Sequence, residues 1–85
     1  MTEPREIRVK RLKMRSMRRG IREMDLILTA YADSHLDAMS EGELDLFDQL
    51  LGENDQDLYA WVTGQRPAEG HLAALIEDIA GTYQK

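Results

Sequence analysis

A glycine stands between opposite charges in the segment RRGIREMD, which covers residues 18–25. Arg19 precedes Gly20 directly, and Glu23 follows it three residues later. Glycine tolerates a positive φ and can therefore end a helix, while Glu23 in the first turn of the next helix interacts favourably with the helix dipole. The arginines around this turn have no intramolecular partner that the sequence identifies, so the chemistry they offer is charged contact. These arginines are Arg18, Arg19 and Arg22.

Residue types that support catalysis are present, but their spacing does not match a known catalytic pattern. The chain has no cysteine, its three serines lie outside any nucleophile-elbow pattern, and its two histidines lack ligand-like spacing. Asp45 with Asp48, and Asp55 with Asp57, form close pairs of carboxylates, which we expect on solvated helix faces and at caps because so small a domain should lack an apolar pocket to shift their pKa values. We therefore expect no catalytic residue, no metal and no tightly bound cofactor, and we expect that the chain is not an enzyme.

Positive and negative charge are divided between two parts of the chain. The net charge is −5, but residues 1–22 carry +7 and the remaining residues carry −12. Such a basic segment either folds back onto acidic residues or steers a charged partner. It is also the electrostatic footprint of phosphate binding, so a nucleic-acid or antitoxin-like regulatory protein is the alternative function, in which Lys10, Arg11 and Arg15 would matter most. Against this alternative, the acidic remainder would repel a polyanion, and no aromatic residue interleaves the basic run. We expect no nucleic-acid partner.

Helical periodicity recurs along the chain, whereas alternating strand patterns are nearly absent. A basic helix is predicted over residues 5–18, and a second helix over 21–35 has apolar residues every three or four positions. The third helix begins at Ser40, because Glu43 three residues later completes a capping box, and it ends at Gly52. These three helices would position the charged turn at residue 20 between the first and the second.

Two shorter helices complete the predicted fold. The fourth is capped by Asn54 or Asp55 and stops at Gly64. The fifth follows Pro67, which suits a first helical turn, but Gly70 weakens its beginning, so its regular part starts nearer Ala68 or nearer His71. Tight turns between five short helices predict a compact all-α bundle, a single domain over residues 1–85. The residues expected to anchor its core are Phe47, Leu51 and Trp61.

The region from about residue 12 to residue 64 resembles the succinate dehydrogenase assembly factor family, whose members are small helical bundles. The run RRGIREMDLIL followed by YADSHLDAMSEGELDLFDQLLGENDQDLYAWVTG supports this resemblance. The positions that match best are Arg19, Gly20, Glu23, Asp25, Leu28, the Ser40 to Glu43 helix start, Leu50, Leu51, Asp57, Leu58 and Trp61. The stretches before residue 12 and after Pro67 resemble the family only in general character.

The resemblance implies a chaperone that binds the flavoprotein subunit of succinate dehydrogenase, and it leaves that of fumarate reductase open as a second client. FAD would be the cofactor of the client, bound covalently to a histidine of that client. The Arg-Gly-x-x-Glu surface of such proteins docks near the FAD, which implies that Gly20 lets the client approach closely and that Arg19 and Glu23 form directional charged contacts. The residues implied at the rim of this surface are Arg18, Arg22 and Asp25.

The sequence also predicts where the protein works. No apolar run approaches the roughly 20 residues that span a bilayer, so we expect no membrane insertion. The arginine-rich start contains Glu3 and Glu6, which distinguishes it from a mitochondrial presequence. We expect a soluble protein of the bacterial cytoplasm that is a monomer when free.

Overall fold

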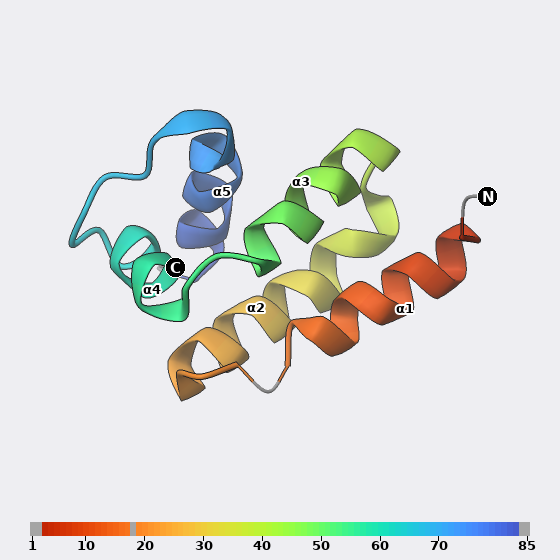
Figure 1. The fold of residues 1–85 in the computed structure, drawn as a ribbon, viewed down its shortest axis with the longest axis horizontal. Coiled ribbons are helices and arrows are strands. Elements are labelled where there is room, and N and C mark those ends of the chain that lie inside the picture. Colours follow the sequence, from red (N-terminus) through yellow and green to blue (C-terminus); the bar gives the residue numbers. More distant parts are fainter. Residues whose placement is uncertain (1–2, 18, 84–85) are drawn as a thin grey trace.

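The computed structural model describes residues 3–17 and 19–83 and places five α-helices in them (Figure 1). Two single 3₁₀ turns, Leu36–Ala38 and Gly70–Leu72, precede α3 and α5, and these described residues contain no strand. The prediction of an all-α bundle of five short helices is confirmed. The helices are α1 (Arg5–Arg15), α2 (Arg22–His35), α3 (Glu41–Leu51), α4 (Asp55–Val62) and α5 (Ala73–Tyr83).

The first helix ends three residues earlier than its predicted range. Its last turn tightens into 3₁₀ geometry, since the Ser16 and Met17 amides donate to the carbonyls three residues before them at 3.2 and 3.1 Å. The Ser16 hydroxyl is buried and donates to the Leu12 carbonyl at 2.9 Å. The chain then leaves the helix and turns into α2, which runs back across α1 (Figure 1).

The predicted starts of α3 and α4 are confirmed in their hydrogen bonds. The Ser40 amide donates to Glu43 Oε1 at 2.8 Å, and the Glu43 amide donates to Ser40 Oγ at 3.2 Å, which completes the capping box. The bond from the Ser40 amide lowers the pKa of Glu43 below its usual value. At α4 the cap is Asn54, whose side chain accepts from the Gln56 amide at 2.8 Å. Asp55 is therefore available for another contact.

The connection between α4 and α5 is where the sequence prediction was least accurate. Gly64 has φ of +83° and ends α4 as predicted, with the Gln65 amide bonded back to the Ala60 carbonyl at 2.8 Å. The fifth helix begins at Ala73, beyond both predicted starts, Ala68 and His71, and closer to the second. Gly70 has φ of +80°, which interrupts a helix, so regular α5 can start only after the 3₁₀ turn that follows.

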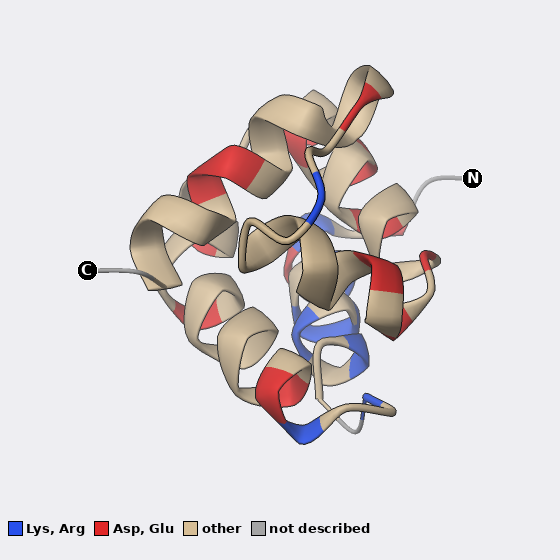
Figure 2. Ribbon diagram, turned by 90° about the vertical axis from the view of Figure 1, so that its left-hand side faces the viewer, with Lys and Arg blue, Asp and Glu red and all other residues tan. Residues whose placement is uncertain are grey.

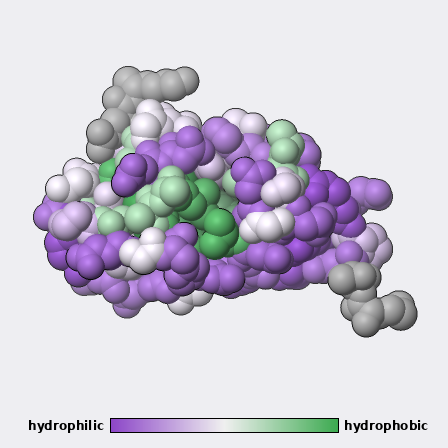
Figure 3. All heavy atoms as spheres, turned by 90° about the horizontal axis from the view of Figure 1, so that it is seen from above, coloured by the Kyte–Doolittle hydropathy of each residue, from purple (hydrophilic) through white to green (hydrophobic). Residues whose placement is uncertain are grey.

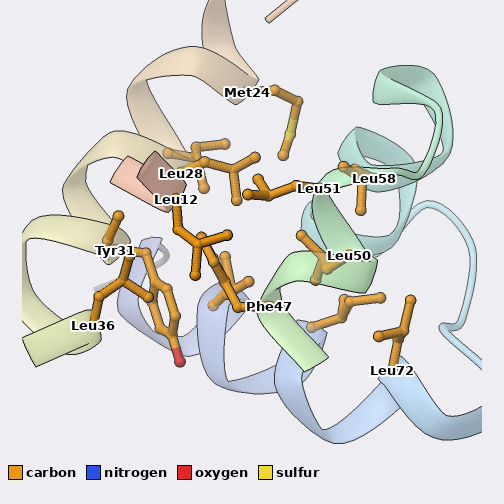
Figure 4. Close-up of a cluster of buried hydrophobic side chains, with 14 of the residues drawn as sticks. Leu12, Met24, Leu28, Tyr31, Leu36, Phe47, Leu50, Leu51, Leu58 and Leu72 are labelled. Atoms are coloured by element: carbon orange, nitrogen blue, oxygen red, sulfur yellow. The ribbon is translucent and has the colours of Figure 1, made fainter. Parts of the chain in front are cut away.

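Side chains from the helices converge on one hydrophobic core (Figure 4). Phe47 and Leu51 are 0% and 3% exposed, which confirms two of the three predicted anchors. The prediction that Trp61 is buried was wrong. Trp61 is half-buried at the edge of the core. The guanidinium of Arg66 lies over its ring, 6.0 Å from the ring centroid.

A hollow of about 410 Å³ separates α3 from α5. Leu46 and Leu75 lie partly exposed in it, beside Glu43 and Asp78. Figure 3, which views the molecule from above, shows hydrophobic side chains enclosed by hydrophilic ones on this face. The helices α2 and α4 pack directly against α5, whereas this surface hollow lies between α3 and α5.

Candidate functional site

The charged turn between α1 and α2 is fastened to the connection between α3 and α4. The Arg19 guanidinium donates to Asp55 Oδ1 through Nε at 2.8 Å and pairs with the same oxygen through Nη2 at 2.7 Å. Its Nη1 also donates to the Leu51 carbonyl at 2.9 Å, and its Nη2 to the Glu53 carbonyl at 3.2 Å. These bonds occupy carbonyls that the end of α3 leaves without a helical partner. The Arg19 side chain is only 12% exposed.

Arg19 therefore corrects the expectation that the arginines of this turn have no intramolecular partner. Its guanidinium is committed to Asp55, whose side chain is 15% exposed, and to backbone carbonyls. Arg22 is exposed, and no ion pair links it to any residue in the described ranges. Arg18 lies outside the described residues. Of the two described arginines of the turn, Arg19 binds other parts of the bundle and Arg22 faces solvent.

Gly20 is exposed and lies directly against Asp55. Its amide donates to Asp55 Oδ2, so a single carboxylate holds both the Arg19 guanidinium and the next backbone amide. A Cβ at position 20 would lie 3.1 Å from that oxygen, which is tighter than ordinary contact. The prediction of a positive φ at this glycine was wrong, since that conformation occurs at Gly64 and Gly70 instead. Glycine is required here by the close approach to Asp55.

Glu23 points away from this network and toward solvent. It is exposed in the first turn of α2, and within the described chain it forms no ion pair. It lines one end of a groove between α2 and α5, together with Leu26 and Tyr83. Asp25 is half-buried and accepts a long hydrogen bond from the Thr29 hydroxyl at 3.4 Å, so its carboxylate is less available to a partner than that of Glu23. Among the described residues, the exposed members of the predicted site are therefore Gly20, Arg22 and Glu23.

Three arginines of α1 pair with acidic residues of α3. Figure 2 shows the basic residues of this segment in blue, with acidic residues, in red, on the other helices. Arg5 and Arg8 each pair with Glu41 at 3.0 Å, and Arg8 also contacts Asp45. Arg15 pairs with Asp48. Of the two outcomes that the charge division allowed, the structure shows the intramolecular one for these residues. Phosphate binding would have to compete with carboxylates already in place.

The described residues contain neither a group of side chains that could hold a metal ion nor a helix that could cross a membrane. Among residues 3–17 and 19–83, no three His, Asp or Glu side chains are grouped so that they could hold a metal ion. No helix there combines the length and the apolar character that crossing a bilayer requires.

Comparison with known proteins places the chain in a family. The family described as flavinator of succinate dehydrogenase matches residues 10–82. The chain belongs to this family. The match covers more of the chain at both ends than the region from residue 12 to residue 64 on which the sequence resemblance was based.

Two relatives show how the family match extends to individual proteins. The chain is 49% identical over 61 residues to "Succinate dehydrogenase assembly factor 2, mitochondrial" of Meyerozyma guilliermondii, which covers 72% of this chain and 45% of that protein. It is 39% identical over 62 residues to "FAD assembly factor SdhE" of Legionella pneumophila, which covers 73% of this chain and 78% of that protein. The chain thus spans less than half of the fungal relative and most of the bacterial one.

Within this flavinator family member, sequence reasoning found the turn but missed the residue that holds it. Asp55 was interpreted only as a possible cap or a solvated acid, although its carboxylate binds both Arg19 and Gly20. One signal was available, because Asn54 already supplies the cap of α4 and leaves Asp55 without that task. The exposed Leu26 and Tyr83 were also missed as surface features.

Proposed function

We propose that this flavinator family member is an assembly factor that binds the flavoprotein subunit of succinate dehydrogenase and promotes covalent attachment of FAD to it. The observation that supports the proposal most is the exposed surface of Gly20 and Glu23, on a turn that the Arg19–Asp55 pair fastens to the bundle. A binding surface on a fixed backbone loses little conformational freedom when it docks. FAD is the cofactor of the client, and the reacting histidine belongs to the client.

The proposed mechanism needs no catalytic group in this chain. A partner that binds one conformer of the client more tightly than the others raises the population of that conformer. If FAD and the client histidine are aligned in this conformer, they react faster, because the entropic cost of orienting them has already been met. A tenfold shift requires only about 1.4 kcal/mol of differential binding. We therefore propose a chaperone that is not an enzyme, acting as a monomer in the bacterial cytoplasm.

We infer a different role for each residue of the turn from its exposure and contacts. Gly20 presents bare backbone, so the client surface can approach closely. Glu23 has no ion pair among the described residues and offers its carboxylate to a cationic group of the client. Arg19 acts as a positioning residue, because its guanidinium is bound to Asp55 and to two carbonyls. Arg22 and Asp25 stand at the rim.

The test is covalent flavin incorporation into the apo flavoprotein subunit. Purified protein, apo subunit and FAD are mixed, denatured at intervals, and the flavin fluorescence of the subunit band is measured. A faster rise than in the protein-free control supports the proposal. Glu23→Ala should abolish the rise, whereas Glu77→Ala, which removes an exposed helical glutamate of α5, should not. No rise with the wild-type protein, from a client competent under other conditions, overturns the proposal.

A further inference from the structure

An apolar groove between α2 and α5 begins at the proposed docking residue Glu23. It has a volume of about 330 Å³, and Leu26 and Tyr83 form its two rims. Leu26 is 62% exposed and Tyr83 47% exposed, which makes them two of the five large apolar side chains that the described structure leaves in solvent. Ile27 and Ile79, at 5% and 1% exposure, close its floor.

The second helix therefore has two apolar faces. Its inner face packs Met24, Leu28 and Tyr31 into the core, each at most 2% exposed. Its outer face repeats at positions 23, 26, 27 and 30, which is the spacing of a helical stripe. Only Ile27 on that outer face is needed by the core. Leaving a leucine such as Leu26 unburied forfeits the stabilisation that its burial would supply, which marks a surface available to a partner.

The chemistry of the groove defines what fits it. Its walls are apolar apart from Thr82, whose hydroxyl already donates to the Asp78 carbonyl at 3.1 Å, and Glu23 at one end. Among the described residues that line the groove, Glu23 is the only ionisable group besides the phenol of Tyr83, and Glu23 has no ion pair within the described chain. The complementary ligand is an apolar side chain with a lysine or arginine beside it. A volume of about 330 Å³ holds only one or two such side chains.

We propose that this groove receives an apolar side chain of the flavoprotein client, next to a Lys or Arg of the client that pairs with Glu23. The inference rests on the proposed function, and it extends the docking surface from the turn along α2. Continuity supports the client as occupant, since Glu23 belongs to the turn surface and lies one helical turn before Leu26.

The test measures the affinity of the apo flavoprotein subunit for variants of the whole chain at low and at high salt. Leu26→Ala and Tyr83→Ala remove the two rims, and each should weaken binding by about tenfold at both salt concentrations. Glu23→Gln keeps the shape but removes the charge, so its loss should be large at low salt and should shrink at high salt. Met14→Ala is the matched control, because Met14 is 63% exposed on α1, outside the groove.

Each result either supports the groove or overturns it. Loss in both rim variants with Met14→Ala unchanged supports it, and unchanged circular dichroism shows that these exposed positions do not act through folding. Wild-type binding with no loss in Leu26→Ala and Tyr83→Ala overturns the groove and leaves the proposed function standing. Absence of wild-type binding overturns both. A concentration-dependent dimer that Leu26→Ala dissociates would assign the groove to a second copy and overturn the client as its occupant.

Discussion

The Arg19 guanidinium and the Asp55 carboxylate lie 2.7 Å apart and join the α1–α2 turn to the first residue of α4. Both side chains are largely shielded from solvent, at 12% and 15% exposure. The same carboxylate accepts from the Gly20 amide, so it sets the backbone of the turn as well as its side chain. Asp55 thereby determines the geometry with which Gly20 faces a partner.

Asp55→Ala should lower the free energy of unfolding by about 2 to 3 kcal/mol, because it removes the carboxylate that pairs with the shielded Arg19 guanidinium and accepts from the Gly20 amide. Urea unfolding followed by circular dichroism measures the change. The matched control is Asp57→Ala, which breaks the pair with Arg66, whose partners are 42% and 54% exposed. That exposed pair should contribute less than about 1 kcal/mol. Equal losses in the two variants would show that shielding of the Arg19–Asp55 pair has no energetic consequence.

Gly20→Ala should be destabilising by about 1 kcal/mol, since the added Cβ would lie 3.1 Å from Asp55 Oδ2 and would displace it. The reason can be tested by a double-mutant cycle. In the Asp55→Ala background the opposing oxygen is absent, so Gly20→Ala should cost much less there. If the cost is the same in both backgrounds, the close approach to Asp55 is not what requires glycine at this position.

Gly20→Arg should abolish support for flavin attachment while the protein keeps most of its helicity. Gly20 is exposed and lies outside the helices, so a long side chain there can point to solvent and hold a client away. The measurement combines the in-gel flavin assay with circular dichroism. The control is Gly81→Arg, on the far end of α5, where no atom lies within 4 Å of an added Cβ. Wild-type flavin attachment in Gly20→Arg would contradict the docking role of this turn.

Local signals explain the parts of the fold that the sequence predicted well. Ser40 and Glu43 satisfy one another's amides within four residues, so the start of α3 needs no information from elsewhere in the chain. The end of α4 at Gly64 is equally local, because a positive φ at glycine closes it. The start of α5 was left open between Ala68 and His71 because two competing local signals, Pro67 and Gly70, lie three residues apart.

The candidate site was predicted only in part because its decisive contact is not local. Arg19 and Asp55 are 36 residues apart, and two acids of similar spacing, Asp55 and Asp57, offered no basis for a choice between them. The choice depends on how α3 and α4 meet, which sequence periodicity does not specify. The groove was missed for the same reason, since Leu26 and Tyr83 become its rims only when α2 and α5 pack together.

Tyr31 predicts how stability should change at alkaline pH. Burial, and then the hydrogen bond that its hydroxyl donates to Asp78 at 2.6 Å, raise the pKa of Tyr31 above its usual range. The folded state therefore keeps the phenol proton above pH of about 10, where the unfolded state releases it. Stability from this residue is complete below that pH and is lost as pH rises further.

The measurement for Tyr31 is the free energy of unfolding between about pH 8 and pH 11, compared with Tyr31→Phe. The wild-type protein should be more stable at pH 8, because the variant lacks the bond to Asp78. The advantage should shrink above about pH 10. Tyr59 and Tyr83 occur in both proteins, so their ionisation cancels in the comparison. A constant difference across the range would contradict a raised pKa for Tyr31.

Replacement of Lys10, Arg11 and Arg15 together by glutamine should leave flavin attachment within about twofold of the wild type. These are the residues that a nucleic-acid binder would need most, yet Arg11 already pairs with Glu3 at 2.9 Å and Arg15 with Asp48. Fluorescence anisotropy with a labelled DNA duplex is the complementary measurement. A phosphate-binding helix would lose affinity by orders of magnitude, about 10³ or more, between 50 and 200 mM salt. Because carboxylates already pair with Arg11 and Arg15, we expect no binding at either salt concentration, and a steep salt-dependent signal would restore the nucleic-acid alternative.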